Sequence, residues 1–200
     1  MTTLARLPLY LLFSLLATLS FTACVEDDPI DFDDPPEPPV VVNELSKDGD
    51  NFTAPRLPPG QHRFAVRFSE SELLDFDGRE LTGVSIFVAP GATPEYIDVR
   101  VLQGGDTQPG REVTIAGEDT PRDLGQFITY TFDEPVAIDA EEPLWLEAEV
   151  QIATAQQTIG CDAGPRVPGG DWLWSEDRYL PFAERAPGES VNWNIRGVLR

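Results

Sequence analysis

Residues 144–150 read LWLEAEV, and two kinds of side chain alternate through the whole stretch. One set is Leu144, Leu146, Ala148 and Val150, and the other is Trp145, Glu147 and Glu149. Successive side chains of a β-strand point to opposite faces, so this period of two predicts a strand with one face in a core. The same period recurs after residue 60, in the stretches 64–68, 84–88, 97–101, 128–132 and 192–199.

Turn signals separate these stretches and include Asp77-Gly78, Pro90-Gly91, Gly104-Gly105 and Gly169-Gly170. Many short strands with regular turns predict an all-β chain, and we expect an antiparallel β-sandwich. One short helix is expected after Ser69, because Ser69 and Glu72 match a capping box.

The N-terminus has the order of a signal peptide over residues 1–23. Arg6 supplies positive charge, residues 7–21 are apolar, and two small residues directly precede Cys24. The sequence FTAC at 21–24 resembles the lipobox of bacterial lipoproteins, which implies fatty acyl chains such as palmitate on Cys24. An ordinary secretory signal and a membrane span are the alternatives, but the apolar run is short for a span.

Residues 24–42 are expected to form the lipidated cysteine and a disordered tether. Seven acidic residues and five prolines lie between positions 25 and 39, without a basic residue among them. Such a segment repels itself and cannot bury enough apolar area to fold. The acidic cluster also resembles the surface-export signal of lipoproteins in Bacteroidota-type bacteria, which implies an outer-membrane or cell-surface location. We expect residues 43–200 to form one sandwich domain.

The formal net charge of −21 limits the classes of molecule that the chain can bind. Phosphate backbones and anionic membrane surfaces would repel such a chain, so we expect no nucleic acid binding. Contact with a membrane would come through the lipid on Cys24. Only Cys24 and Cys161 are present, so lipidation would leave Cys161 without a disulfide partner.

Three ordered stretches resemble a known family: 67–84, the segment GCDAGP at 160–165 leading to Trp172, and NWNIRG at 192–197. They are similar to jelly-roll domains of surface proteins in Bacteroidota, including adhesin-type modules attached to gingipain-like proteases. The resemblance implies a jelly-roll-like sandwich and a role in adhesion or carbohydrate binding.

Aromatic residues gather after Gly169-Gly170, at Trp172, Trp174, Tyr179 and Phe182. They could form a platform that stacks on sugar rings, or they could close one end of the core. Trp172 and Trp174 have the same parity, so in a strand both would point to one face.

Asp162 and Asp171 lie in an irregular loop and could supply part of a calcium site. Turn chemistry explains both residues equally well, and we expect no other cofactor.

Signals for catalysis are weak, because His62 is the only histidine and no serine lies in a Gly-x-Ser-x-Gly motif. We expect a non-catalytic binding or adhesion module whose partner is a glycan or an envelope protein. The alternatives are an accessory subunit of an envelope complex and, less favoured, a glycoside hydrolase with two converging carboxylates.

Overall fold

The computed structural model describes residues 43–118, 124–175 and 177–200. They belong to the second of two units into which contacts divide the chain, Met1–Pro39 and Val40–Arg200. The predicted signal peptide, Cys24 and the tether lie outside the described residues. Within the described ranges, no helix has the length and apolar character needed to cross a bilayer.

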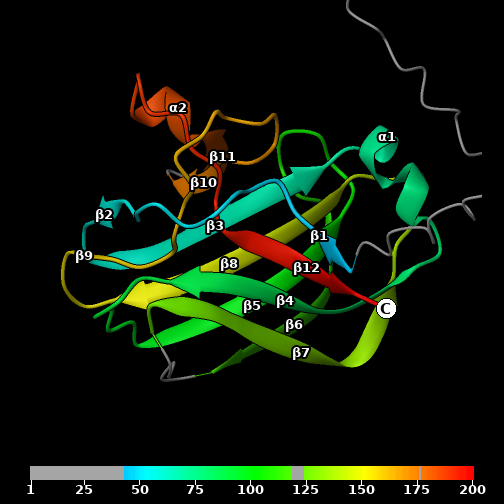
Figure 1. Cartoon of the computed structure of the whole chain (residues 1–200), viewed down its shortest axis with the longest axis horizontal. Coiled ribbons are helices and arrows are strands. Elements are labelled where there is room, and N and C mark those ends of the chain that lie inside the picture. The colour runs from blue at the N-terminus through cyan, green and yellow to red at the C-terminus, as the bar shows by residue number, and fades with distance from the viewer. Residues whose placement is uncertain (1–42, 119–123, 176) are drawn as a thin grey trace, which may run out of the picture. The chain divides into compact units, whose positions relative to one another are not determined.

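Two larger antiparallel sheets face each other and account for most strands (Figure 1). The four-stranded sheet contains, in spatial order, β1 (Glu44–Leu45), β12 (Ile195–Leu199), β4 (Glu80–Val88) and β7 (Gln126–Ala137). The six-stranded sheet contains β11 (Arg178–Pro181), β10 (Trp172–Ser175), β3 (Gly60–Phe68), β8 (Leu144–Ile152), β5 (Tyr96–Gln103) and β6 (Arg111–Glu118). A small third sheet pairs β2 (Arg56–Leu57) with β9 (Gln156–Gln157).

The strand order is that of a jelly roll, which confirms the predicted fold class. Without β2, β9, β10 and β11, eight strands remain along the chain. They fall in the order first, eighth, third, sixth in one sheet and second, seventh, fourth, fifth in the other. Every connection between consecutive strands of this set crosses to the opposite sheet, except the β5–β6 hairpin, as two interlocked Greek keys require. The β10–β11 hairpin extends the second sheet beyond β3.

The helix expected after Ser69 is present as α1 (Glu70–Leu73), followed by a 3₁₀ turn at Leu74–Phe76. The Ser69 amide donates to Glu72 Oε2 at 2.8 Å, as the capping box predicts. A second helix, α2 (Phe182–Arg185), was not predicted. Its N-cap is Pro181, which makes no side-chain capping bond, so the sequence carries no start signal there.

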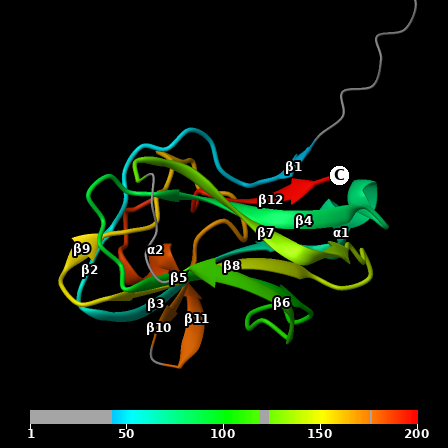
Figure 2. The ribbon, with the colours of Figure 1, turned by 90° about the horizontal axis from the view of Figure 1, so that it is seen from below.

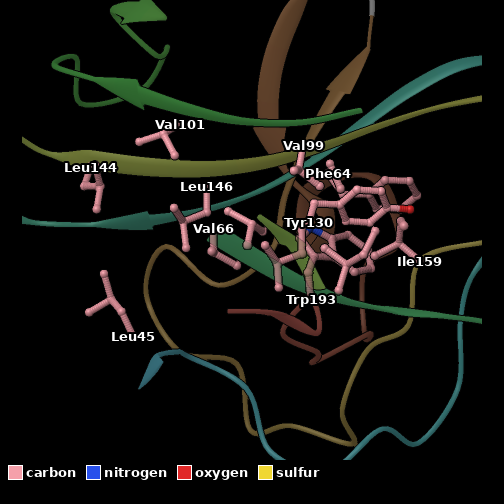
Figure 3. Packing of buried hydrophobic residues seen from close by; sticks show 14 of the residues in the cluster. Leu45, Phe64, Val66, Val99, Val101, Tyr130, Leu144, Leu146, Ile159 and Trp193 are labelled. Carbon is pink, nitrogen blue, oxygen red and sulfur yellow. The ribbon is translucent and has the colours of Figure 1, made fainter. Parts of the chain in front are cut away.

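The main core fills the space between the two sheets. Phe64 and Trp193 are completely buried, and their rings meet edge to face with centroids 5.1 Å apart. Figure 3 shows these two rings gathered with Tyr130 at one end of the core. The Trp193 indole N–H donates to the Trp172 carbonyl at 2.7 Å, so this core aromatic also holds the start of β10.

We expect Phe64→Ala to lower the free energy of unfolding by about 3–5 kcal/mol, because the truncated ring leaves a cavity in a closed core. A urea titration followed by tryptophan fluorescence would measure the change. The matched control is Phe52→Ala, since Phe52 is 72% exposed and its loss should change stability by no more than about 0.5 kcal/mol. Equal effects of the two substitutions would contradict the packing described here.

Candidate functional site

The outer face of the six-stranded sheet, which points away from the main core, carries a row of charged side chains. Strand alternation sends Arg63 of β3, Glu147 and Glu149 of β8, and Arg100 of β5 to this face. The register places Arg63 opposite Glu149, and Arg100 opposite Glu147. Opposite charges therefore meet across neighbouring strands, as stable cross-strand pairs require.

The β10–β11 hairpin brings aromatic residues to the same face. In Figure 2 it lies on the side of the six-stranded sheet away from β12 and β4. A second apolar cluster forms there around buried Trp145 and Tyr179, with Trp172 and Trp174 partly buried against it. The Trp145 ring centroid lies 5.2 Å from that of Trp172 and 5.8 Å from that of Tyr179.

The β5–β6 loop, residues 104–110, holds this hairpin in place. Gln108 donates to the Tyr179 carbonyl at 3.0 Å and accepts from the Tyr179 amide at 2.9 Å. The Trp145 indole N–H donates to the Gly105 carbonyl at 2.9 Å. Gly105 has φ of +79°, and a Cβ there would lie 1.9 Å from the Gln108 carbonyl oxygen. This tight loop therefore requires glycine.

The two glutamates of β8 are almost completely buried, with exposed fractions of 1% for Glu147 and 2% for Glu149. Arg100 Nη1 donates to both carboxylates, at 2.8 Å and 2.9 Å. Arg63 Nε donates to Glu149 at 2.6 Å, and the Tyr179 hydroxyl donates to Glu147. Each buried charge thus has partners, which offsets the cost of removing it from water.

The surroundings shift the pKa values of Glu149, Tyr179 and Arg100. Burial by itself would raise the pKa of Glu149, but hydrogen bonds from Arg100 and Tyr96 and the nearby positive charges bring it below its ordinary value. Burial and the Glu147 charge raise the pKa of Tyr179, so its hydroxyl remains a donor. Burial by itself would lower the pKa of Arg100, but hydrogen bonds to both glutamates raise it.

A cavity of about 380 Å³ opens beside this cluster. The lining residues that matter here are Arg100, Gln108, Glu112, Trp174 and Tyr179. The Arg63 guanidinium lies over the Trp174 ring, 4.9 Å from its centroid, and holds that ring from one side. The cavity therefore combines an aromatic ring with planar polar groups that donate and accept hydrogen bonds.

The sequence prediction grouped Trp172, Trp174, Tyr179 and Phe182. The structure brings the first three together on the outer face, with both tryptophans on the same side of β10. Phe182 separates from them, because its ring packs on core Trp193 at 5.1 Å between centroids. The local sequence pattern does not show which of these aromatic side chains join the outer cluster and which join the main core.

The charged half of the site was missed by sequence reasoning. It consists of Arg63, Arg100, Glu147 and Glu149, together with Gln108 from the loop. The signal that could have found it was two glutamates on the face of a strand that also carries Trp145. Tryptophan is seldom left in water on an otherwise charged face, so it indicates that something covers that face.

Asp162, a predicted metal ligand, holds the 160–165 loop against the segment before β12. Its carboxylate accepts from the backbone amides of Gly164 and Asn192, at 2.9 Å and 2.8 Å. It also accepts from the Gly49 amide and from the Asn192 side chain, at 3.1 Å and 2.9 Å. All four donors belong to the protein, so the hydrogen bonds give this side chain a structural role.

Asp171, the other predicted ligand, has different partners. It accepts from Arg166 Nε at 2.6 Å and from the Ala183 amide at 3.2 Å. No group of three or more His, Cys, Asp or Glu side chains able to hold a metal occurs in the described part of the chain. Calcium binding at this loop stays a prediction. Cys161 is buried, and burial raises its pKa to about 11.

Comparisons with known proteins bear on the fold. No family model and no curated protein matches the chain. One similar solved structure is the clostridial cysteine protease Cwp84 after propeptide cleavage, with a TM-score of 0.58 and 8% identity over 79% of this chain and 40% of that one. Another contains the cysteine protease and lectin-like domains of Cwp84, a surface layer associated protein of Clostridium difficile, with a TM-score of 0.50 and 8% identity over 70% and 32%. The chain spans less than half the length of either structure, and the likeness shows a shared fold.

The stability contributed by Glu149 should depend on pH. Its pKa in the folded chain lies below the ordinary 4.5, so the unfolded chain binds a proton first as the pH falls. The contribution is therefore complete above the unfolded pKa and is lost as the pH falls through the folded pKa. We expect the difference in unfolding free energy between the wild type and Glu149→Gln to shrink below about pH 4.5.

Urea midpoints measured at a series of pH values would test this expectation. The matched control is Glu134→Gln, which changes an exposed glutamate on β7 of the other sheet. The control should give a small and nearly constant difference from the wild type. A difference for Glu149→Gln that stays constant or grows in acid would contradict the charge network.

Proposed function

We propose that this domain is a non-catalytic glycan-binding module and that it binds sugar in the cavity beside Trp174. The observation that carries the proposal is the pairing of this partly buried indole with fixed polar groups on one wall. Aromatic faces pack against the C–H surfaces of sugar rings, while sugar hydroxyls require nearby donors and acceptors. Arg100 brings N–H donors to the cavity wall, while Glu112 and the side-chain oxygen of Gln108 bring acceptors.

Preorganisation supports the same proposal. Gln108 pairs with the Tyr179 backbone in both directions, and Arg63 lies against the Trp174 ring. A ligand entering the cavity would therefore immobilise few side chains. Binding gains affinity when this entropy cost has already been met by folding.

The structural likeness to Cwp84 gives limited support. One of the two similar structures includes lectin-like domains of a surface layer associated protein. An all-β chain that covers 32% of that structure fits a lectin-like part better than a protease part. This favours both sugar binding and a location at the cell surface.

The carboxylates of β8 favour binding over glycoside hydrolysis. A hydrolase needs one carboxyl group that stays protonated to act as general acid, and the pKa of such a group is raised. The surroundings of Glu149 lower its pKa. Glu147 and Glu149 both accept hydrogen bonds from Arg100, so protein donors already occupy an oxygen of each carboxylate.

The accessory-subunit alternative predicts a contiguous apolar patch for a protein partner. The most exposed large apolar side chains of the described residues are Phe52 and Leu74, which lie in separate segments, and Val113 and Ile115 on β6. Two neighbouring side chains of moderate exposure make a small patch, and we therefore favour the glycan.

Substitution of Trp174 by alanine should weaken glycan binding about tenfold or more, equal to about 1.4 kcal/mol. A glycan array with the full chain purified in detergent would first identify binding sugars, and calorimetry would then compare the variants. Phe52→Ala is the matched control, because it removes an exposed aromatic side chain outside this cavity. The proposal fails if no glycan binds, or if both variants bind equally well.

We also propose that lipid on Cys24 anchors the domain to the outer membrane, with the acidic segment as its spacer. Several acyl chains on one cysteine would anchor a chain stably, whereas one chain would not. Labelling of growing cells with a palmitate analogue should mark the wild type and Cys161→Ser but not Cys24→Ser. These two substitutions are matched, since the chain has only two cysteines. An unlabelled wild type, or a labelled Cys24→Ser, would disprove the anchor.

A further inference from the structure

A second cavity, of about 470 Å³, is lined in part by Trp172 and shares no lining residue with the glycan cavity. Its walls also include Arg67, Ser69, Glu72 and Arg166. The proposed glycan site does not use these groups.

This second cavity contains hydrogen-bond donors without acceptors. Arg67 Nε and Trp172 Nε1 are buried and have no partner among the described residues. Arg166 binds Asp171 through Nε alone, at 2.6 Å. Buried donors that stay unpaired are costly, so the two buried donors of Arg67 and Trp172 at one cavity indicate a place for an acceptor-rich ligand, beside the partly exposed Arg166.

An intramolecular carboxylate already contacts another nitrogen of the Arg67 guanidinium. Arg67 Nη2 donates to Asp106 Oδ1 at 2.5 Å, and the Asp106 side chain is 81% exposed. An exposed ion pair of this kind contributes little to stability. The contact shows that Arg67 can donate to a carboxylate on the solvent side, and it leaves the Nε donor of Arg67 unused.

We propose that this cavity binds the carboxylate of an acidic sugar residue, which displaces Asp106 from Arg67 while the sugar ring packs against Trp172. Arginine favours carboxylates because its planar N–H groups match the two oxygens. The inference rests on the proposed glycan binding and names the ligand class. Trp172 and Trp174 lie two residues apart on the same face of β10, so one glycan chain would place a neutral ring at Trp174 and an acidic ring at Trp172.

The net charge of the chain further restricts which acidic glycans could bind. The chain carries a net charge of −21, which would repel a polyanion at a distance. The positive charges nearby are already balanced, because Arg166 of the cavity wall binds Asp171, and Lys47 binds Glu72 of the wall at 2.5 Å. A glycan with isolated carboxylates between neutral sugars fits this balance better than a polymer with a charge on every residue.

Calorimetry with glucuronate as the probe would test the proposal on the full chain. Glucose and the methyl ester of glucuronate are the matched ligands that lack the charge. We expect glucuronate to bind at least about tenfold more tightly than either ligand, and added salt to reduce this preference.

Two substitutions should then act in opposite directions. Arg67→Gln should weaken glucuronate binding about tenfold, whereas Asp106→Asn should strengthen it severalfold by removing the internal competitor. Asp133→Asn is the matched control for charge, because it neutralises an exposed aspartate on β7 of the other sheet. It should leave the affinity unchanged.

The outcomes separate the two proposals. If neutral glycans bind at Trp174 but glucuronate shows no preference over its ester, this inference is wrong and the proposed function stands. If neither class binds, both are wrong. If Asp106→Asn and Asp133→Asn change the affinity equally, the effect comes from net charge and the competition with Asp106 is disproved. Thermal unfolding of Arg67→Gln would show whether a loss of binding reflects a loss of folding, and Asp106→Asn tests the site without removing a buried group.

Discussion

The outer face depends on the contact between one guanidinium, that of Arg100, and two buried carboxylates, Glu147 and Glu149. The glutamates sit on β8, the strand between β3 and β5. A buried carboxylate without a partner is strongly destabilising, so these two tolerate burial only while their donors are present. The donors come from β3, β5 and the β10–β11 hairpin. Both carboxylates are therefore fully paired only when all three elements are in register.

This requirement explains why β8, which lies inside the six-stranded sheet between β3 and β5, is buried on both faces. All residues of β8 except one are buried, although only every second side chain faces the main core. Apolar contacts around Trp145 add to the ion pairs on the outer side. Together they hold the hairpin against the sheet, and the cavity beside it has walls that do not need to be ordered by a ligand.

The sequence predicted the strands because their period of two is local information. It did not predict that the β10–β11 hairpin covers the outer face of β8, because that hairpin comes later in the chain. Glu147 and Glu149 therefore look solvent-facing in the sequence but are buried in the structure. The same limit applies to Trp174 and Phe182: both are aromatic, yet one joins the outer cluster and the other the main core. Short α2 lacked a capping signal and was missed for a local reason.

The loop at residues 104–110 links the two cavities physically. Gln108 holds the Tyr179 backbone at one of them, while Asp106 contacts Arg67 at the other. The loop is short, and Gly105 has no room for a side chain. Asp106 and Gln108 are separated by one residue, so the contacts at the two cavities share one short backbone segment. If ligands occupy both cavities, their binding free energies need not be independent, and any coupling would act equally in both directions.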